Sequence, residues 1–447
     1  MMLCLLFSTA EAQVRRLSLS DALSVALEYN RELKVAKLEQ EKSGQSVREA
    51  WGNVYPSLTL TGQFAHSFRN TNFFIFPAGF GGPPGAGGGT TAPTQIIATG
   101  INSINATLQF TQSLYRGAVW AGIRASSVVN ELSQASYLST KATTVTEVKK
   151  AYYDVLISQE SARLIEQSIA RNELALQDAR QLYRQGLAAD IDTLRAFIAV
   201  ENLKPQLIKA LNGVETAKIA LKVKIGLPAD EELELTDSLK FEDKMGDITF
   251  AQAYQEALAM RPEIKQLELQ VRANEEQIAA EFSNILPTLD AFVQAQVLTL
   301  QTNFNISSYQ WGTNLAAGLQ LSVPIFSGFR NEARLVRAEM EKQQNQTRLE
   351  NLREVIRSEI SISLSNVMEA KKRIAVQATT VQSAERSYAL TRSRRKQGIG
   401  SQLELTDAEL ALNQAKVNYL QAVYDYLVAI ANLEKALGRA GRMPEAR

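Results

Sequence analysis

The sequence predicts an α+β membrane protein whose chain is built from two copies of one structural repeat. Three observations lead to this fold class. Segments of the first half align with segments of the second half, and four stretches of 12–13 residues alternate between apolar and polar side chains. In addition, each half contains a stretch of close to 70 residues with almost no Gly or Pro. Alternation of apolar and polar residues is typical of strands, and long stretches without Gly or Pro are typical of long helices. Each half is therefore expected to contain two strands and one long helix.

The repeat is visible by direct alignment. LSLSDALSVALEYNRELK (17–34) aligns with ITFAQAYQEALAMRPEIK (248–265) without a gap, and Gly226 aligns with Gly438 at the other end of the repeat. A repeat of this length indicates internal duplication rather than a solenoid. The first repeat is therefore predicted at 13–226 and the second at 248–438, with a linker at 227–247 and a C-terminal tail at 439–447.

The N-terminus is typical of an export signal. Residues 1–7 are apolar, and Ala10-Glu11-Ala12 has the small-x-small pattern that precedes a signal-peptidase cleavage site. We therefore expect residues 1–12 to be a signal peptide. The alternative is a short apolar tail that packs on the protein.

The composition excludes several classes of function. The chain has one Cys (Cys4) and one His (His66), which excludes a disulfide framework, His-rich metal sites and a Ser-His catalytic pair. Lys and Arg number 48 against 47 Asp and Glu, so no basic field for nucleic acid is present. Neither a metal set nor a phosphate-binding loop is visible, and we expect no enzyme activity and no cofactor.

The strands and helices follow in the same order in both halves. A first helix at 21–54 ends before Pro56, as expected for residues that precede proline. The predicted strands are long enough to cross a bilayer when tilted, which takes ~9–11 residues, and they lie at 57–68, 103–115, 288–300 and 314–326. Two soluble hairpins with one face on a core would show the same alternation, and the long helices decide between the two interpretations.

The long helices are predicted at 118–185 and 329–397, each about 100 Å long. Apolar residues recur at spacings of three and four along the second one, which indicates a coiled-coil seam. Each is followed by a turn and a shorter helix, at 190–225 and 403–437. The linker between the repeats carries eight acidic residues and two lysines, so we expect a solvated connector.

Four strands per chain are too few for a closed transmembrane barrel, because the smallest known ones have eight. An open sheet edge cannot exist in lipid. If the strands cross a membrane, several chains must therefore combine their strands in one barrel.

From 17 to 438 the chain resembles the TolC-like outer-membrane factor family, also called outer membrane efflux proteins. The motifs that carry the resemblance are the paired Asn-x-x-Pro segments before the first strand of each half, the segment LSVPIFSGFRNEARLVRA (321–338) and the paired R/K-Q-G turns. The resemblance implies a homotrimer with a twelve-stranded barrel in outer-membrane lipid, continued by a long α-helical coiled-coil periplasmic tunnel. Such proteins are passive exit ducts of efflux or type I secretion systems, and their partners are a periplasmic adaptor protein and an inner-membrane pump.

The resemblance also places a periplasmic entrance at the two turns between long and short helices. Gly186 and Leu187 form the tip of the first turn, and Gly398 and Ile399 form the tip of the second. In the family these tips close the channel and dock the adaptor. Independently of function, each glycine is the residue expected where a helix ends with a positive φ.

Four residues near these tips are candidates for the gate. By position, Glu404 and Asp407 match the acidic ring of the family's constriction, and Asp192 matches the residue that bonds across to the second turn. The family has an aromatic hydroxyl where this chain has Arg395, so a salt bridge between Asp192 and Arg395 is expected. A family arginine is replaced by Gly400. The alternative is that the acidic residues only favour helix N-termini.

A second class of function agrees with part of these observations. A periplasmic coiled-coil scaffold without a channel would also need long helices, and its strands would form two hairpins outside the membrane.

Overall fold

The computed structural model describes residues 15–68, 73–75, 95–97, 102–243, 248–301, 305, 307 and 309–442. The predicted signal peptide 1–12, most of segment 69–102 and the end of the predicted tail lie outside the described residues. The chain divides into two compact units. The helical unit comprises residues 1–43, 129–271 and 343–447, and the sheet unit comprises residues 44–128 and 272–342.

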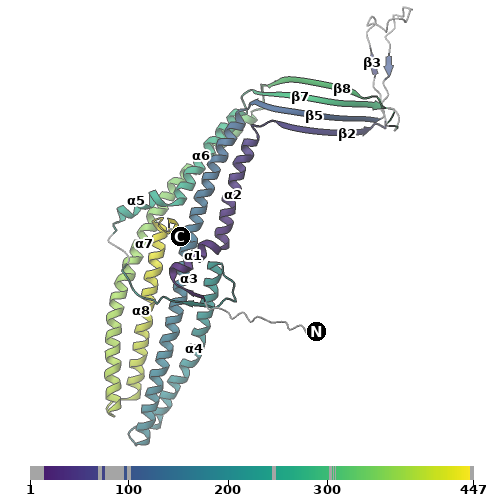
Figure 1. The fold of residues 1–447 in the computed structure, drawn as a ribbon. Coiled ribbons are helices and arrows are strands. Elements are labelled where there is room, and N and C mark those ends of the chain that lie inside the picture. The colour runs from purple at the N-terminus through teal and green to yellow at the C-terminus, as the bar shows by residue number, and fades with distance from the viewer. Residues whose placement is uncertain are drawn as a thin grey trace, which may run out of the picture. The chain divides into compact units, whose positions relative to one another are not determined.

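Helices make up most of the described chain (Figure 1). Two long helices, α3 (Gly117–Arg184) and α7 (Arg330–Lys396), are each followed by a shorter one, α4 (Asp190–Ile225) and α8 (Gln402–Ala436). Each repeat begins with two further helices. These are α1 (Leu19–Tyr29) and α2 (Arg31–Gly52) in the first repeat, and α5 (Phe250–Met260) and α6 (Pro262–Ser283) in the second. No helix of the described chain combines the length and the apolar character needed to cross a membrane.

The prediction of one continuous helix at 21–54 is wrong, because the helix is interrupted at Asn30. This residue has an extended backbone, with φ −60° and ψ 127°. Its side chain donates a hydrogen bond to the Lys224 carbonyl oxygen (2.7 Å) and accepts one from the Leu33 amide (2.8 Å). The break therefore depends on a contact with α4, which the helical periodicity of the local sequence does not reveal.

The same joint occurs in both repeats. At Gly226, which ends α4 with φ 81°, an added Cβ would lie 2.3 Å from the Tyr29 carbonyl oxygen. At Gly438, just after α8 and with φ 78°, an added Cβ would lie 2.7 Å from the Met260 carbonyl carbon. In each half, the end of the last helix thus abuts the break between the first two helices. The two aligned glycines are required by both their backbone conformation and this close approach.

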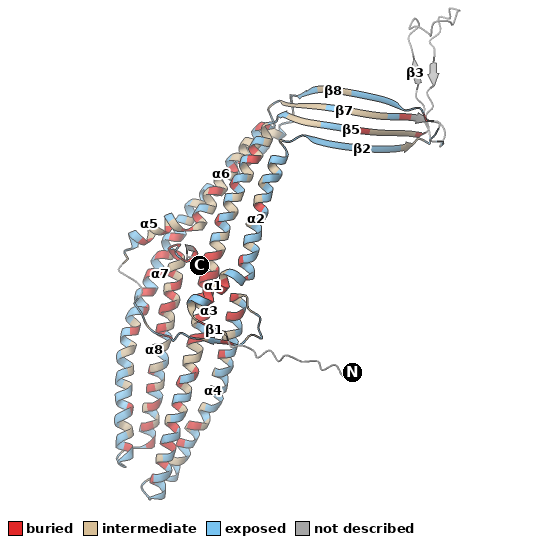
Figure 2. Ribbon diagram, in the orientation of Figure 1, coloured by how far each residue is buried: buried red, intermediate tan, exposed pale blue. Residues whose placement is uncertain are grey.

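The core of the helical unit gathers around α1, α3, α7 and α8 (Figure 2). Tyr152 of α3 is fully buried and donates a hydrogen bond to the Asp237 carboxylate (2.8 Å). Burial, reinforced by this carboxylate, raises the pKa of Tyr152. Asp237 belongs to the acidic linker, which the sequence predicted to be a solvated connector.

Most of the described linker residues are exposed, but the linker is more than a connector, because two of its leucines belong to the core. Strand β6 (Leu233–Leu235) pairs in parallel with β1 (Arg15–Leu17), and Leu233 and Leu239 are buried. The acidic composition of the linker draws attention away from its alternating leucines. In an extended segment, alternation places these apolar side chains on one face, which here packs on the core.

The sheet unit contains one four-stranded antiparallel sheet in the order β2–β5–β7–β8. Its strands are β2 (Ser57–His66), β5 (Asn102–Tyr115), β7 (Thr288–Gln301) and β8 (Gly312–Ser322). The short strands β3 (Phe73–Ile75) and β4 (Gln95–Ile97) pair separately. Strand β8 ends before the predicted limit of 326, because β7 offers no partner beyond Thr288 and Pro324 has no amide hydrogen to donate.

The register of the sheet sorts its side chains by polarity. One row across the four strands joins Leu60, Leu108, Ala295 and Leu315, and the adjacent row joins Thr61, Thr107, Gln296 and Asn314. Neighbouring rows point to opposite faces, so one face is apolar and the other is largely polar. On the apolar face, Leu60, Leu108 and Leu315 are exposed in the single chain, and an exposed row of large apolar side chains is typical of a surface that contacts a partner or lipid.

We predict that Gly438→Ala lowers the stability of the helical unit by about 2 kcal/mol or more, because the new Cβ would meet the Met260–Arg261 backbone and φ is unfavourable. Thermal unfolding followed by circular dichroism at 222 nm in detergent measures this effect.

Gly213→Ala is the matched control, because nothing lies within 4 Å of the added Cβ in the interior of α4. Alanine favours a helix interior, so this variant should unfold at the same or a higher temperature. Equal melting temperatures for the two variants would contradict the proposed joint.

Candidate functional site

The two turns between long and short helices have the same hydrogen-bonding pattern. In the first turn, the Leu187 amide donates to the Leu182 carbonyl (2.9 Å) and the Gly186 amide donates to the Tyr183 carbonyl (2.9 Å). The second turn repeats these bonds from Ile399 to Arg394 (3.1 Å) and from Gly398 to Arg395 (3.0 Å). This is the Schellman motif, which needs a left-handed residue after the helix.

Glycine meets that need in both turns, with φ 72° at Gly186 and 75° at Gly398. The residues that follow them, Leu187 and Ile399, are exposed. The turns therefore present one large apolar side chain each to the surroundings.

An ion pair joins the two turns, and we call it the tip ion pair. Nη2 of Arg395, in the last turn of α7, lies 3.2 Å from Oδ2 of Asp192, in the first turn of α4. The Arg395 side chain is only 7% exposed and that of Asp192 is 19% exposed. Each charge also suits the dipole of its own helix end. The structure thus brings together the two residues that the sequence analysis paired.

Gly400 takes part in holding Arg395. Its carbonyl oxygen accepts a hydrogen bond from Arg395 Nη1 (3.0 Å). The Nε atom of Arg395 and Oε1 of Gln402 are buried and make no hydrogen bond within the described residues. Unpaired buried groups leave the tip less tightly bonded than a fully satisfied network.

Glu404 and Asp407 do not take part in the tip ion pair, although Glu404 Oε2 lies beside Gly400, 3.6 Å from the place of an added Cβ. Both are exposed, and they are three residues apart in the first two turns of α8, hence on one side of that helix. Neither makes an ion pair within the described chain. The Glu404 amide donates a hydrogen bond to the Ser401 hydroxyl (3.1 Å), so Ser401 caps the start of the helix. The two carboxylates take no part in this cap.

Sequence reasoning missed a second ion pair, which lies farther along the helices from the tips. Nε of Arg171 in α3 donates to both carboxylate oxygens of Glu409 in α8, at 3.0 and 2.9 Å. The two side chains are 18% and 8% exposed. One signal was available in the sequence, because Glu409 lies between Leu405 and Leu412 on the buried side of α8. An acid at such a position needs a partner.

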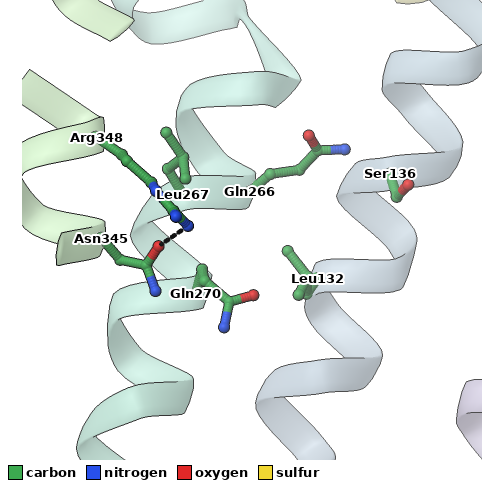
Figure 3. Close-up of a pocket in the computed structure, with 7 residues that line it drawn as sticks. All are labelled: Leu132, Ser136, Gln266, Leu267, Gln270, Asn345 and Arg348. Atoms are coloured by element: carbon green, nitrogen blue, oxygen red, sulfur yellow. Dashed lines mark hydrogen bonds between the residues drawn. The ribbon is translucent and has the colours of Figure 1, made fainter. Parts of the chain in front are cut away.

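The described residues contain no group of three or more His, Cys, Asp or Glu side chains arranged to hold a metal ion. A cavity of about 470 Å³ opens between α3, α6 and α7 (Figure 3). It is lined by Leu132, Ser136, Gln266, Leu267, Gln270, Asn345 and Arg348. Arg348 Nη1 donates to Asn345 Oδ1 (3.1 Å), and this lining pairs no nucleophile with a base.

Known proteins are similar to this chain over nearly its whole length. A family model described as "Outer membrane efflux protein" matches residues 22–227 and 253–439. The probable efflux pump outer membrane protein TtgC of Pseudomonas putida is 24% identical, over 94% of this chain and 83% of its own length. The cation efflux system protein CusC of Escherichia coli is also 24% identical, over 93% of this chain and 85% of its own length.

Solved structures agree with this result. A crystal structure of CusC has a TM-score of 0.74 at 20% identity and covers 94% of this chain and 92% of its own. The outer membrane protein VceC of Vibrio cholerae has a TM-score of 0.73 at 16% identity, with 94% and 96% coverage. The fold class predicted from the sequence is thereby confirmed. Because the two matched segments lie one in each repeat and together cover most of the chain, this protein belongs to the outer membrane efflux protein family.

Proposed function

We propose that three copies of this chain form a passive exit duct through the outer membrane. The observation that carries the proposal is the four-stranded sheet with one apolar face and two edge strands, β2 and β8, each with a single neighbour among the described strands. An unpaired edge is too costly in hydrocarbon, so the edges must pair with other chains. Three chains supply twelve strands, which is above the minimum of eight.

The helical unit would then form the wall of a periplasmic tunnel. Helices α3 and α4 form the first hairpin and helices α7 and α8 form the second, and the turns of both hairpins carry the exposed Leu187 and Ile399. We propose that these tips dock a periplasmic adaptor protein, which connects the duct to an inner-membrane pump of an efflux or type I secretion system. Exposed apolar side chains on rigid helix ends are suited to such a contact.

The tip ion pair is proposed to keep the periplasmic entrance closed at rest. It connects the first hairpin to the second, and its side chains are largely buried. Removing one partner leaves the other buried without a counter-charge, which is destabilising for the state that contains the pair. The open arrangement, in which the remaining side chain reaches water, would gain population.

We predict that Asp192→Ala and Arg395→Ala each raise the resting conductance of the channel in planar lipid bilayers, with an increase in open probability of about fivefold or more. Lys204→Ala is the control, because this lysine pairs with Glu201 on the exposed surface of α4 and exposed pairs contribute little.

The swapped double variant Asp192→Arg with Arg395→Asp should restore the low conductance in part. Unchanged conductance in both single variants would exclude this pair as the gate.

The exposed acids supply a second prediction. With three chains around one axis, Glu404 and Asp407 would place six carboxylates at the entrance, which attracts cations. We predict that the double variant Glu404→Ala with Asp407→Ala loses cation selectivity and loses block by divalent cations from the periplasmic side, while the assembly stays intact.

The matched control is Glu166→Ala with Glu173→Ala, which removes two exposed acids from one side of α3. Both effects are read from single-channel currents and reversal potentials. If the Glu404/Asp407 variant keeps its selectivity and its block, these acids only begin a helix.

A further inference from the structure

The buried ion pair between Arg171 and Glu409 connects the same two hairpins as the tip ion pair, at a different level. Arg171 precedes the first tip glycine, Gly186, by fifteen residues, and Glu409 follows the second, Gly398, by eleven. Arg171 belongs to α3 of the first hairpin and Glu409 to α8 of the second. The pair therefore holds the hairpins together above the tips, within the helical unit.

Two donors of α3 converge on the Glu409 carboxylate. The single Nε–H of Arg171 is shared between its two oxygens (3.0 and 2.9 Å), and the Ser168 hydroxyl donates to Oε1 (2.8 Å). The Asn172 side chain in turn donates to the Ser168 carbonyl (2.9 Å) within the same turn of α3. By comparison, the tip ion pair has one contact of 3.2 Å. Each arginine has one buried nitrogen without a hydrogen bond in the described residues, Nη2 in Arg171 and Nε in Arg395. The carboxylate of Glu409 is thus held by α3 alone, through a fixed set of donors.

The surroundings of the pair are apolar. Ala175 of α3, Tyr388 of α7, and Leu405 and Leu412 of α8 form a buried cluster beside it. Burial raises the pKa of Tyr388, and the charge of Glu409 acts in the same direction. Because the Glu409 side chain is only 8% exposed, loss of Arg171 would leave a largely buried, uncompensated charge between the hairpins.

We propose that Arg171 and Glu409 form a second closing contact of the entrance, and that without Arg171 the charge of Glu409 drives α8 away from α3 until the carboxylate reaches water. The two residues position the hairpins and do not contact the transported substrate. The predicted effect on conductance rests on the channel function proposed above. The predicted separation of the hairpins does not depend on it.

The first test separates the charge from the loss of packing. Arg171→Met keeps most of the apolar stem of arginine and removes the charge, and it should raise the resting conductance in planar bilayers by about fivefold or more. Adding Glu409→Gln removes the uncompensated charge while retaining an oxygen that accepts from Ser168, and this double variant should return the conductance toward the original value.

Lys416→Met is the matched control. Lys416 pairs with Glu385 (2.8 Å) within the second hairpin, between α8 and α7, so its loss should leave the conductance unchanged. A merely structural role of Arg171 predicts that the double variant is at least as defective as Arg171→Met, since it lacks both partners. That result would overturn the proposal.

The second test does not depend on channel activity. Ala175, 8% exposed, lies in the buried cluster, and an Ala175→Cys variant in a Cys4→Ser background reports whether the hairpins have separated. The rate of its reaction with a maleimide in detergent should rise with Arg171→Met and fall again when Glu409→Gln is added. A rise of smaller size is expected for Arg171→Lys, which keeps the charge but not the Nε–H that both carboxylate oxygens share. Arg171→Lys replaces Arg171→Met if that variant does not assemble.

The two tests together distinguish the possible failures. If the maleimide rates follow this order but no variant conducts, including Asp192→Ala, the closing contact stands and the proposed channel function is wrong. If the rates are the same with and without Arg171, the proposed closing contact is wrong, whatever the conductance.

Discussion

The backbone hydrogen-bonding groups at the two edges of the four-stranded sheet impose the constraint on which the rest of the account depends. Within the described chain, β2 pairs only with β5, and β8 pairs only with β7. The apolar face between these edges suits lipid, in which unpaired amide and carbonyl groups are too costly to persist. A single chain therefore has a sheet that suits the outer membrane and edges that do not, and pairing between chains resolves this conflict.

The helical unit is built from structural features that occur once in each repeat. Each repeat ends its last helix at a glycine that abuts the break between its first two helices, at Gly226 in the first repeat and at Gly438 in the second. The capping boxes are duplicated as well, with Ser18 and Asp21 at the start of α1 and Thr249 and Gln252 at the start of α5. The two ion pairs follow the repeat at the level of helices, because exchanging the repeats converts a contact of α4 with α7 into one of α8 with α3. They do not follow it at the level of residues, because Arg395 precedes its tip glycine by three residues and Arg171 precedes its own by fifteen.

Features with a local cause could be predicted from the sequence. Alternation predicted which residues share a face of the sheet, because an exposed sheet with one apolar face imposes a strict period of two. The tip glycines Gly186 and Gly398 were predicted because a Schellman motif needs a left-handed residue after a basic last turn. The pairing of Asp192 with Arg395 came from the resemblance to the family and not from the spacing of the residues. Features with a tertiary cause were missed: the break at Asn30 depends on the Lys224 carbonyl, and the Arg171–Glu409 pair joins positions 238 residues apart.

The number of chains in the assembly tests the central claim most directly. Native mass spectrometry of the full-length protein, purified from outer membranes in mild detergent, gives this number without any assumption about conductance. The account predicts one dominant species with three times the mass of the mature chain, which dissociates to monomers only when the sheet unfolds. A stable monomer that keeps its strand content by infrared spectroscopy would contradict the account, because its sheet edges would then persist without the partner strands that lipid requires.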